Sequence, residues 1–214
     1  MKYRDRRDAG LRLAGILKTS SYSEPFVLAL PRGGVPVAFE VARALSAPME
    51  IFVARKIGAP HQPEFGIGAI AEGGVHVFDD RTVSRLGLTP AQLQDLAAAA
   101  EQELHRRVDS YRGARALPRL AGRDVILVDD GLATGVTAEA ALSGLRQHKP
   151  RKLILAAPVC APSTCVRLSQ LADEVVCEQR PESFLAVGLW YDDFSQVTDG
   201  EVASLMSKVL ETRT

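Results

Sequence analysis

Two adjacent carboxylates ahead of a loop of small and hydroxyl residues carry the clearest chemistry in the chain. Asp129 and Asp130 follow an apolar, strand-like run, and the loop 131–137 then opens a helical pattern. Backbone N–H groups at the start of a helix, together with the hydroxyls of Thr134 and Thr137, form a cradle for an anion. Carboxylates bind vicinal hydroxyls well because they accept hydrogen bonds through both oxygens. The pattern therefore predicts a ligand with a phosphate at one end and a diol at the other, as in a ribose 5-phosphate.

A second loop in an equivalent position supplies a positive charge. The residues Pro31-Arg32-Gly33-Gly34 follow another apolar run and open another helical pattern. The two glycines let the backbone approach an anion closely, and Arg32 offers a fork of donors. An ordinary turn between a strand and a helix is the alternative. If the two preceding strands are neighbours in a parallel sheet, both loops face one ligand at its carboxyl edge.

A pair of cations follows a third apolar run. Arg55 and Lys56 precede the Gly- and Pro-rich stretch 58–63. Cations at the end of a strand can stabilise the charge on a departing pyrophosphate, and surface charges without a ligand are the alternative. A late aromatic cluster either packs in the core or contacts a ligand, and it consists of Trp190, Tyr191 and Phe194.

Short apolar runs alternate with helical patterns along most of the chain, which predicts an α/β fold. Apolar runs without in-and-out alternation are typical of strands buried on both faces, as in a parallel sheet. We therefore predict an open, mainly parallel five-stranded sheet with helices on both faces. The predicted strands are 26–30, 51–54, 125–128, 153–157 and 175–177.

Further patterns complete the predicted organisation. The stretch 58–63 is predicted as a loop, and 66–78 as a small hairpin around Gly73-Gly74. Thr89, Pro90 and Gln92 form a capping box at the start of the longest helix, which Gly113 can end. We expect one domain over 1–214. Its parts are a core over about 24–180, an N-terminal helix over 4–19, and a C-terminal hood and helix over about 181–211.

The composition argues against several functional classes. The 214 residues include 26 Lys and Arg against 26 Asp and Glu, and this neutral balance argues against wholesale binding of nucleic acid or anionic membranes. No apolar run approaches the roughly 18 residues of a membrane span, and no signal-peptide core follows the N-terminus. Cys160, Cys165 and Cys177 match neither a zinc site nor a CxxC motif, which predicts reduced core thiols. We therefore expect a cytoplasmic protein.

These motifs resemble those of a known family. The segment 125–137 resembles the motif by which type I phosphoribosyltransferases bind 5-phosphoribosyl 1-pyrophosphate (PRPP), with Asp-Asp and then a loop ending Ala-Thr-Gly-x-Thr. The segment 31–34 resembles their pyrophosphate loop, which often contains a strained or cis peptide bond. With 55–60, 63–70 and 190–194, the resemblance reaches small stand-alone bacterial members of unassigned substrate. Two residues depart from many members, which have an apolar residue in place of Gly131 and a glycine in place of Val136.

The resemblance implies a role for each candidate residue. Asp129 and Asp130 would hold the ribose 2- and 3-hydroxyls and contact Mg²⁺ directly or through water. The 5-phosphate would lie on Gly131, Leu132, Ala133, Thr134, Gly135, Val136 and Thr137. The pyrophosphate would lie on Arg32, Gly33, Gly34, Arg55 and Lys56. The implied catalytic residues are Arg32, Lys56 and Asp130, and the candidates for stacking on the base are Trp190 and Tyr191.

The implied activity is Mg²⁺-dependent transfer of the 5-phosphoribosyl group from PRPP to a nitrogen base, with release of pyrophosphate, as a step of nucleotide metabolism. A homodimer is expected by analogy. Two other functions stay open: a regulator of RNA, DNA or a protein partner that binds PRPP or a nucleotide without turnover, and a sugar-phosphate hydrolase. The N-terminal arginines are predicted to form a solvated helix face, with contact to RNA or a partner as the alternative; they are Arg4, Arg6, Arg7 and Arg12.

Overall fold

Five parallel strands form the central sheet of the computed structural model, which describes residues 1–60, 62–113 and 115–211. Their order across the sheet is β2-β1-β6-β7-β8, and every neighbouring pair is parallel. This order confirms the predicted architecture and makes β1 and β6 direct neighbours. The strands are β1 (Phe26–Ala29), β2 (Met49–Ile51), β6 (Asp124–Val128), β7 (Lys152–Val159) and β8 (Glu174–Gln179).

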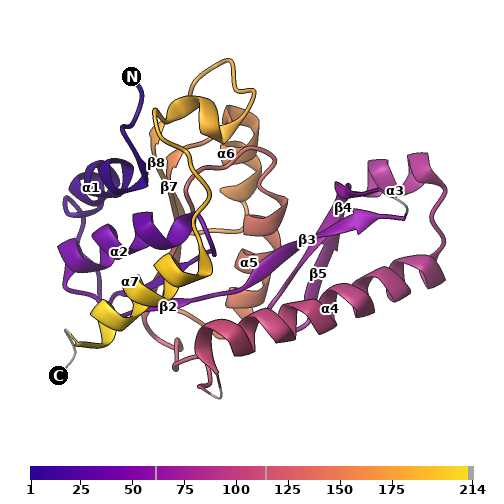
Figure 1. The fold of residues 1–214 in the computed structure, drawn as a ribbon, viewed down its shortest axis with the longest axis horizontal. Helices are drawn as coiled ribbons and strands as arrows, with labels where there is room; N and C mark the ends of the chain where they lie inside the picture. Colours follow the sequence, from indigo (N-terminus) through magenta and orange to yellow (C-terminus); the bar gives the residue numbers. More distant parts are fainter. Residues whose placement is uncertain (61, 114, 212–214) are drawn as a thin grey trace.

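Helices cover both faces of this sheet, as predicted (Figure 1). Consecutive strand residues point to opposite faces, so Val27 and Ala29 belong to one apolar core while Phe26 and Leu28 belong to the other. The first core includes residues of α1 (Arg6–Leu17), α2 (Gly34–Leu45) and α7 (Asp199–Glu211). The second includes residues of α5 (Val136–Gln147) and α6 (Pro162–Leu168).

A second unit of structure projects to one side of the central sheet (Figure 1). It is an antiparallel three-stranded sheet in the order β3-β4-β5, with two helices, and we call these five elements the arm. They are β3 (Ala54–Ala59), β4 (Gln62–Ala71), β5 (Val75–Phe78), α3 (Asp80–Leu86) and α4 (Pro90–Arg112).

Two predictions about the arm are wrong in part. The run 51–54 is not one strand, because β2 ends at Ile51 and β3 already begins at Ala54. The stretch 58–63 is not a plain loop either, since β3 continues to Ala59 and β4 begins at Gln62, with register shifts at Gly58 that act as bulges. Residue 61 lies outside the described residues. The predicted hairpin around Gly73-Gly74 is confirmed as β4 and β5.

A buried ion pair joins the arm to the central sheet. Arg112, at the end of α4, donates to both carboxylate oxygens of Glu72 at 3.0 and 2.5 Å and to the carbonyl of Ile51 at 3.0 Å. The same Glu72 carboxylate accepts the N–H of Val53 at 2.6 Å. The chain therefore leaves the central sheet at Val53, because its N–H bonds to a side chain of the arm and not to a neighbouring strand.

The two helices of the arm differ in how well their sequence predicts them. In α4 the capping box is present as predicted, with the Thr89 hydroxyl accepting the N–H of Gln92 at 3.3 Å, and Gly113 follows the last turn. The sequence analysis missed α3, which has no buried residue and so lacks an apolar period. The carboxylate of Asp79 caps it by accepting the N–H groups of Arg81 and Thr82.

The N-terminal segment meets the segment around Trp190 beside the central sheet. The N–H of Tyr3 donates to the carbonyl of Trp190 at 2.8 Å, and its hydroxyl donates to the carbonyl of Pro158 at 2.8 Å. The three cysteines are free thiols, as predicted, with Cys160 and Cys165 buried and Cys177 half-buried. Over 1–60, 62–113 and 115–211, no helix combines the length and apolar character needed to cross a bilayer.

Candidate active site

The two predicted anion loops lie against each other at the carboxyl edge of the sheet. The preceding strands β1 and β6 are neighbours, with Ala29 opposite Val128. A Cβ atom on Gly33 would lie 1.9 Å from Oδ2 of Asp130, and one on Gly34 would lie 2.7 Å from the carbonyl oxygen of Val128. Only glycine therefore allows this approach of the two loops. The sequence analysis required β1 and β6 to be neighbours if both loops are to face one ligand, and the structure meets this condition.

Arg32 stands at the turn of the first loop, after a peptide bond with Pro31 that is cis. Its Nη1 lies 3.7 Å from Oδ1 of Asp199, at the start of α7. The hydroxyl of Tyr111 donates to the same carboxylate at 3.0 Å. Arg32 is thus held at the rim of the loop by a carboxylate that is itself largely exposed, and a stronger anion could replace this partner.

The two carboxylates of the second loop lie close together in a partly buried position. The N–H of Asp130 donates to Oδ1 of Asp129 at 2.8 Å, and the hydroxyl of Tyr191 donates to the carbonyl of Asp130. Burial raises the pKa of both carboxyl groups, and the neighbouring charge of Asp130 raises the pKa of Asp129 further. Such a concentration of negative charge favours a ligand that brings hydroxyl donors or a cation.

The loop 131–137 is held by hydrogen bonds from two side chains of α6. The hydroxyl of Thr164 donates to the carbonyl of Ala133 at 2.5 Å, and Arg167 donates to the carbonyl of Thr134. Gly135 has a φ of +67° at the N-cap of α5, where no side chain caps the helix. The first-turn N–H groups of α5 are therefore not taken by a capping side chain, as an anion cradle requires.

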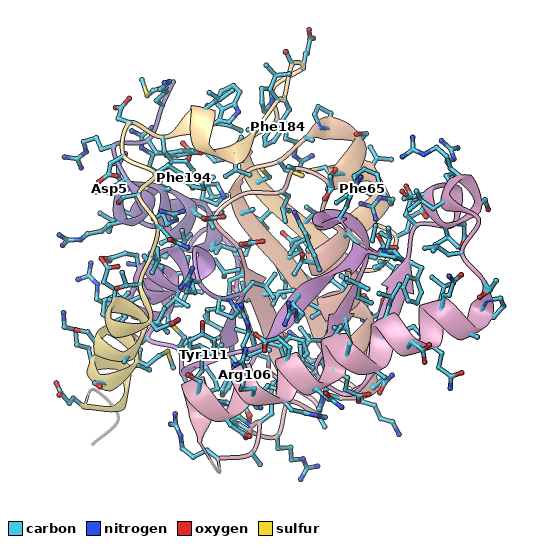
Figure 2. All side chains as sticks on the ribbon, turned by 45° about the vertical axis from the view of Figure 1, so that its right-hand side comes forward. Asp5, Phe65, Arg106, Tyr111, Phe184 and Phe194 are labelled. Carbon is cyan, nitrogen blue, oxygen red and sulfur yellow. The ribbon has the colours of Figure 1, made fainter. Side chains whose placement is uncertain are left out.

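The predicted cation pair is divided between two sides of the arm. Arg55 lies 3.3 Å from Oε1 of Glu103 on α4, and its pKa is lowered by burial and then by the nearby charges of Arg107 and Arg106. Lys56 is exposed and lines a cavity of about 690 Å³ between the arm and the start of α5, together with Phe65, Phe78 and Thr134. Figure 2 shows Phe65 where the arm meets the central part of the molecule.

Comparisons with known proteins agree with this geometry. The family model of the phosphoribosyl transferase domain matches residues 8–193. The chain belongs to the phosphoribosyltransferase family. A Mycobacterium tuberculosis (strain H37Rv) protein named "Putative phosphoribosyl transferase Rv0571c" is 44% identical over 204 residues, which are 95% of this chain and 46% of that protein. The chain therefore spans about half the length of the curated relatives it matches.

The chain is also similar to solved structures. Protein TT1426 from Thermus thermophilus is 43% identical with a TM-score of 0.82, over 97% of this chain and 99% of that chain. Protein AQ2163 from Aquifex aeolicus is 15% identical with a TM-score of 0.50, over 81% of this chain and 73% of that one. The second likeness shows the fold alone.

The sequence analysis missed one residue of this candidate site, Arg6 on α1. Its predicted place on a solvated face is wrong, since its side chain is 11% exposed and its Nε donates to Oδ2 of Asp130 at 2.7 Å. The side chains of Arg4 and Arg7 are mostly exposed, as predicted, although Arg4 precedes α1. Arg12 is half-buried and pairs with Asp8, so the prediction of a solvated side chain is wrong there as well. Arg6 precedes the buried residue Ala9 by one helical turn, and this spacing is the signal that could have identified it.

The two predicted stacking candidates have different surroundings. Tyr191 is 3% exposed, and its ring contacts the rings of Tyr3 and Phe194 at centroid distances of 5.3 and 4.9 Å. Little of this ring is left for a base, which agrees with the packing alternative. Trp190 is half-buried and stacks on Phe184 at 6.4 Å. It stays the candidate for contact with a base.

Proposed function

We propose that the chain transfers the 5-phosphoribosyl group of PRPP to a nitrogen of a base and releases pyrophosphate, with Mg²⁺ as the metal. The observation that carries this proposal is the packing of Gly33 against the carboxylate of Asp130. It joins an arginine loop, an acidic pair and an anion cradle at one edge of the sheet. PRPP has the matching groups: a pyrophosphate, a ribose diol and a 5-phosphate.

The proposed reaction breaks the bond between C1 of the ribose and a pyrophosphate oxygen. It forms a bond from C1 to the base nitrogen, whose proton is released to water. C1 passes through an oxocarbenium-like state, so the chain need not supply a nucleophile. Asp129 and Asp130 would orient the ribose, the loop 131–137 would hold the 5-phosphate, and Arg32 and Lys56 would stabilise the departing pyrophosphate.

The acidic pair fits Mg²⁺. This ion usually takes one or two carboxylates from a protein and completes its shell with water and substrate phosphates. Burial raises the pKa of Asp129 and of Asp130 because it penalises the charged carboxylates, and a bound cation would offset this penalty. In the described part of the chain no three His, Cys, Asp or Glu side chains are grouped to hold a metal, so substrate oxygens would complete the coordination. When bound, the ion would neutralise charge on the pyrophosphate.

A nucleotide-metabolic role in the cytoplasm, where the three thiols would stay reduced, belongs to the same proposal. The acceptor base would approach C1 from the side of the C-terminal hood, where Trp190 is half-buried. A homodimer also stays part of the proposal.

Thermal melting with PRPP and Mg²⁺ tests the proposal. Ligand at about a hundred times its dissociation constant adds roughly 2.7 kcal/mol. For a chain of this size the melting temperature should rise by about 5–11 °C. The rise should vanish in Asp130→Asn and persist in Asp95→Asn, which changes an exposed aspartate on α4.

Pyrophosphate release with a panel of bases then separates an enzyme from a regulator. Release that depends on the base supports the transfer reaction. A melting shift without release from any base would favour the regulator, and release of ribose 5-phosphate without a base would favour the hydrolase. No shift in the wild-type protein would overturn PRPP as the ligand.

A further inference from the structure

An arginine outside every recognised motif reaches the carboxylate at the centre of the site. We infer that Arg6 is a positioning residue, which fixes the carboxylate of Asp130 so that its second oxygen meets a ribose hydroxyl. This inference rests on the proposed function, because it assigns the ribose diol to the acidic pair. It makes the N-terminal helix a part of the sugar site.

Three contacts immobilise the guanidinium of Arg6. Its Nε donates to Oδ2 of Asp130 at 2.7 Å, and its Nη1 donates to the carbonyl of Ser195 at 2.7 Å. Its Cζ lies 3.9 Å from the centre of the Phe194 ring, within the range of a cation–π contact. Figure 2 shows Phe194 close to Asp5, at the start of α1. The arginine is therefore held by the C-terminal segment while it holds the carboxylate.

The loop 31–34 packs against the contact between Arg6 and Asp130. A Cβ atom on Gly33 would lie 3.2 Å from Nε of Arg6 and 1.9 Å from Oδ2 of Asp130. The contact between arginine and carboxylate thus lies directly against this loop. Neither group can therefore shift toward Gly33 without moving the loop as well.

This arrangement divides the oxygens of the acidic pair. Arg6 donates a hydrogen bond to Oδ2 of Asp130, and the N–H of Asp130 donates one to Oδ1 of Asp129. Each carboxylate therefore has one oxygen held by an N–H donor of the protein, and we assign its second oxygen to a ligand hydroxyl. Two oxygens at fixed positions match the two adjacent hydroxyls of a ribose. A carboxylate free to rotate would lose this match.

Discrimination between two sugars measures this role directly. We would determine the dissociation constants of ribose 5-phosphate and 2-deoxyribose 5-phosphate by calorimetry, without metal, for the wild-type protein, Arg6→Met and Arg7→Met. Arg7 is the matched control because it neighbours Arg6 on α1 but is 73% exposed and pairs with Glu40. One hydrogen bond to a charged group favours ribose by roughly tenfold or more in the wild-type protein.

The positioning role predicts that Arg6→Met reduces this preference to about threefold or less, while Arg7→Met keeps it. A purely structural role would weaken the binding of both sugars equally and leave the preference unchanged, which would overturn the inference. Tighter binding of ribose 5-phosphate to Arg6→Met would overturn it as well, since Arg6 would then compete with the sugar.

Two further variants keep the test decisive. Arg6→Lys keeps the charge but lacks the planar fork, so its preference should fall between those of the wild type and Arg6→Met. If Arg6→Met is unfolded, a wild-type preference in Arg6→Lys overturns the inference. Asp130→Asn should abolish the preference. If the wild-type protein shows no preference and Asp130→Asn changes nothing, the proposed function fails; if Asp130→Asn loses the preference while the Arg6 variants keep it, the inference alone fails.

Discussion

The ribose side of the site and the arm present their charged groups in opposite ways. On the ribose side, Arg6 and Asp130 are both nearly buried and hold each other at 2.7 Å. On the arm, Lys56 is exposed at a cavity wall and forms no such ion pair with another of the described residues. We infer that the ribose side is set before a ligand arrives, whereas the cation of the arm responds to one.

The alternation of a β-strand explains why the arm offers one cation and not two. Arg55 and Lys56 are consecutive in β3, so their side chains leave opposite faces of the three-stranded sheet. One face packs on α4, where Glu103 forms an ion pair with Arg55, and the other face lines the cavity. Of these two adjacent cations, Arg55 therefore has a structural role, and Lys56 is the one available to a ligand.

The largest effect is expected at the base of the arm. Glu72→Ala leaves the buried guanidinium of Arg112 and the N–H of Val53 without their partner. Removing one member of a buried ion pair costs about 3–5 kcal/mol, which urea unfolding would measure. Glu182→Ala, at an exposed position, is the control. A loss below about 1 kcal/mol would mean that this pair does not fasten the arm.

The next effect concerns the contact between the two loops. Gly33→Ala places a Cβ atom against the Asp130 carboxylate, so we expect a loss of about 1–3 kcal/mol in stability. Displacement of the carboxylate should also weaken ribose 5-phosphate binding by roughly tenfold or more.

Gly15→Ala is the matched control for this substitution. Gly15 lies on the exposed side of α1 with nothing within 4 Å of its Cβ position, so alanine there should add up to about 1 kcal/mol. Calorimetry and urea unfolding would measure both variants. Wild-type binding in Gly33→Ala would contradict the rigid ribose side.

The same comparison explains what the sequence could predict. Four strands of the central sheet, β1, β2, β6 and β7, are buried on both faces, so their apolar runs and the loops after them are visible in the sequence. α3 has no buried residue, and no apolar period marks it. The division of Arg55 from Lys56 depends on where β3 begins, which the apolar run at 51–54 obscured.

Arg6 was missed for a different reason. Its partner Asp130 lies 124 residues further along the chain, and a charged residue near the N-terminus is usually solvated. Only the packing of α1 on the sheet brings the two together. Contacts between distant elements, set by tertiary packing, are the part of the site that a single sequence does not contain.

A smaller effect should separate the two cations of β3. Lys56→Met should weaken pyrophosphate binding by about threefold to tenfold and leave unfolding unchanged, because an exposed charge contributes little to stability. Arg55→Met should do the reverse, with a loss of about 0.5–1 kcal/mol from the ion pair with Glu103 and no change in pyrophosphate affinity. Calorimetry with pyrophosphate and urea unfolding would measure both. Equal effects of the two variants on pyrophosphate would show that β3 does not divide them.

The smallest effect is expected at the far end of the arm, and it asks how much of the arm serves the site. Thr89→Ala removes the side-chain cap of α4, where Thr89 and Gln92 bond each other reciprocally. The loss should be about 0.5 kcal/mol and local, seen as faster hydrogen exchange in the first turn of α4. Thr89→Ser keeps the hydroxyl and should restore the exchange rates.

Because the cap lies far along the arm from Lys56 and the acidic pair, neither pyrophosphate nor ribose 5-phosphate affinity should change. A weaker affinity for pyrophosphate alone would show that the whole arm moves as one body when it presents Lys56. A weaker affinity for ribose 5-phosphate would be more damaging, since it would mean that the ribose side depends on the arm and is not set in advance.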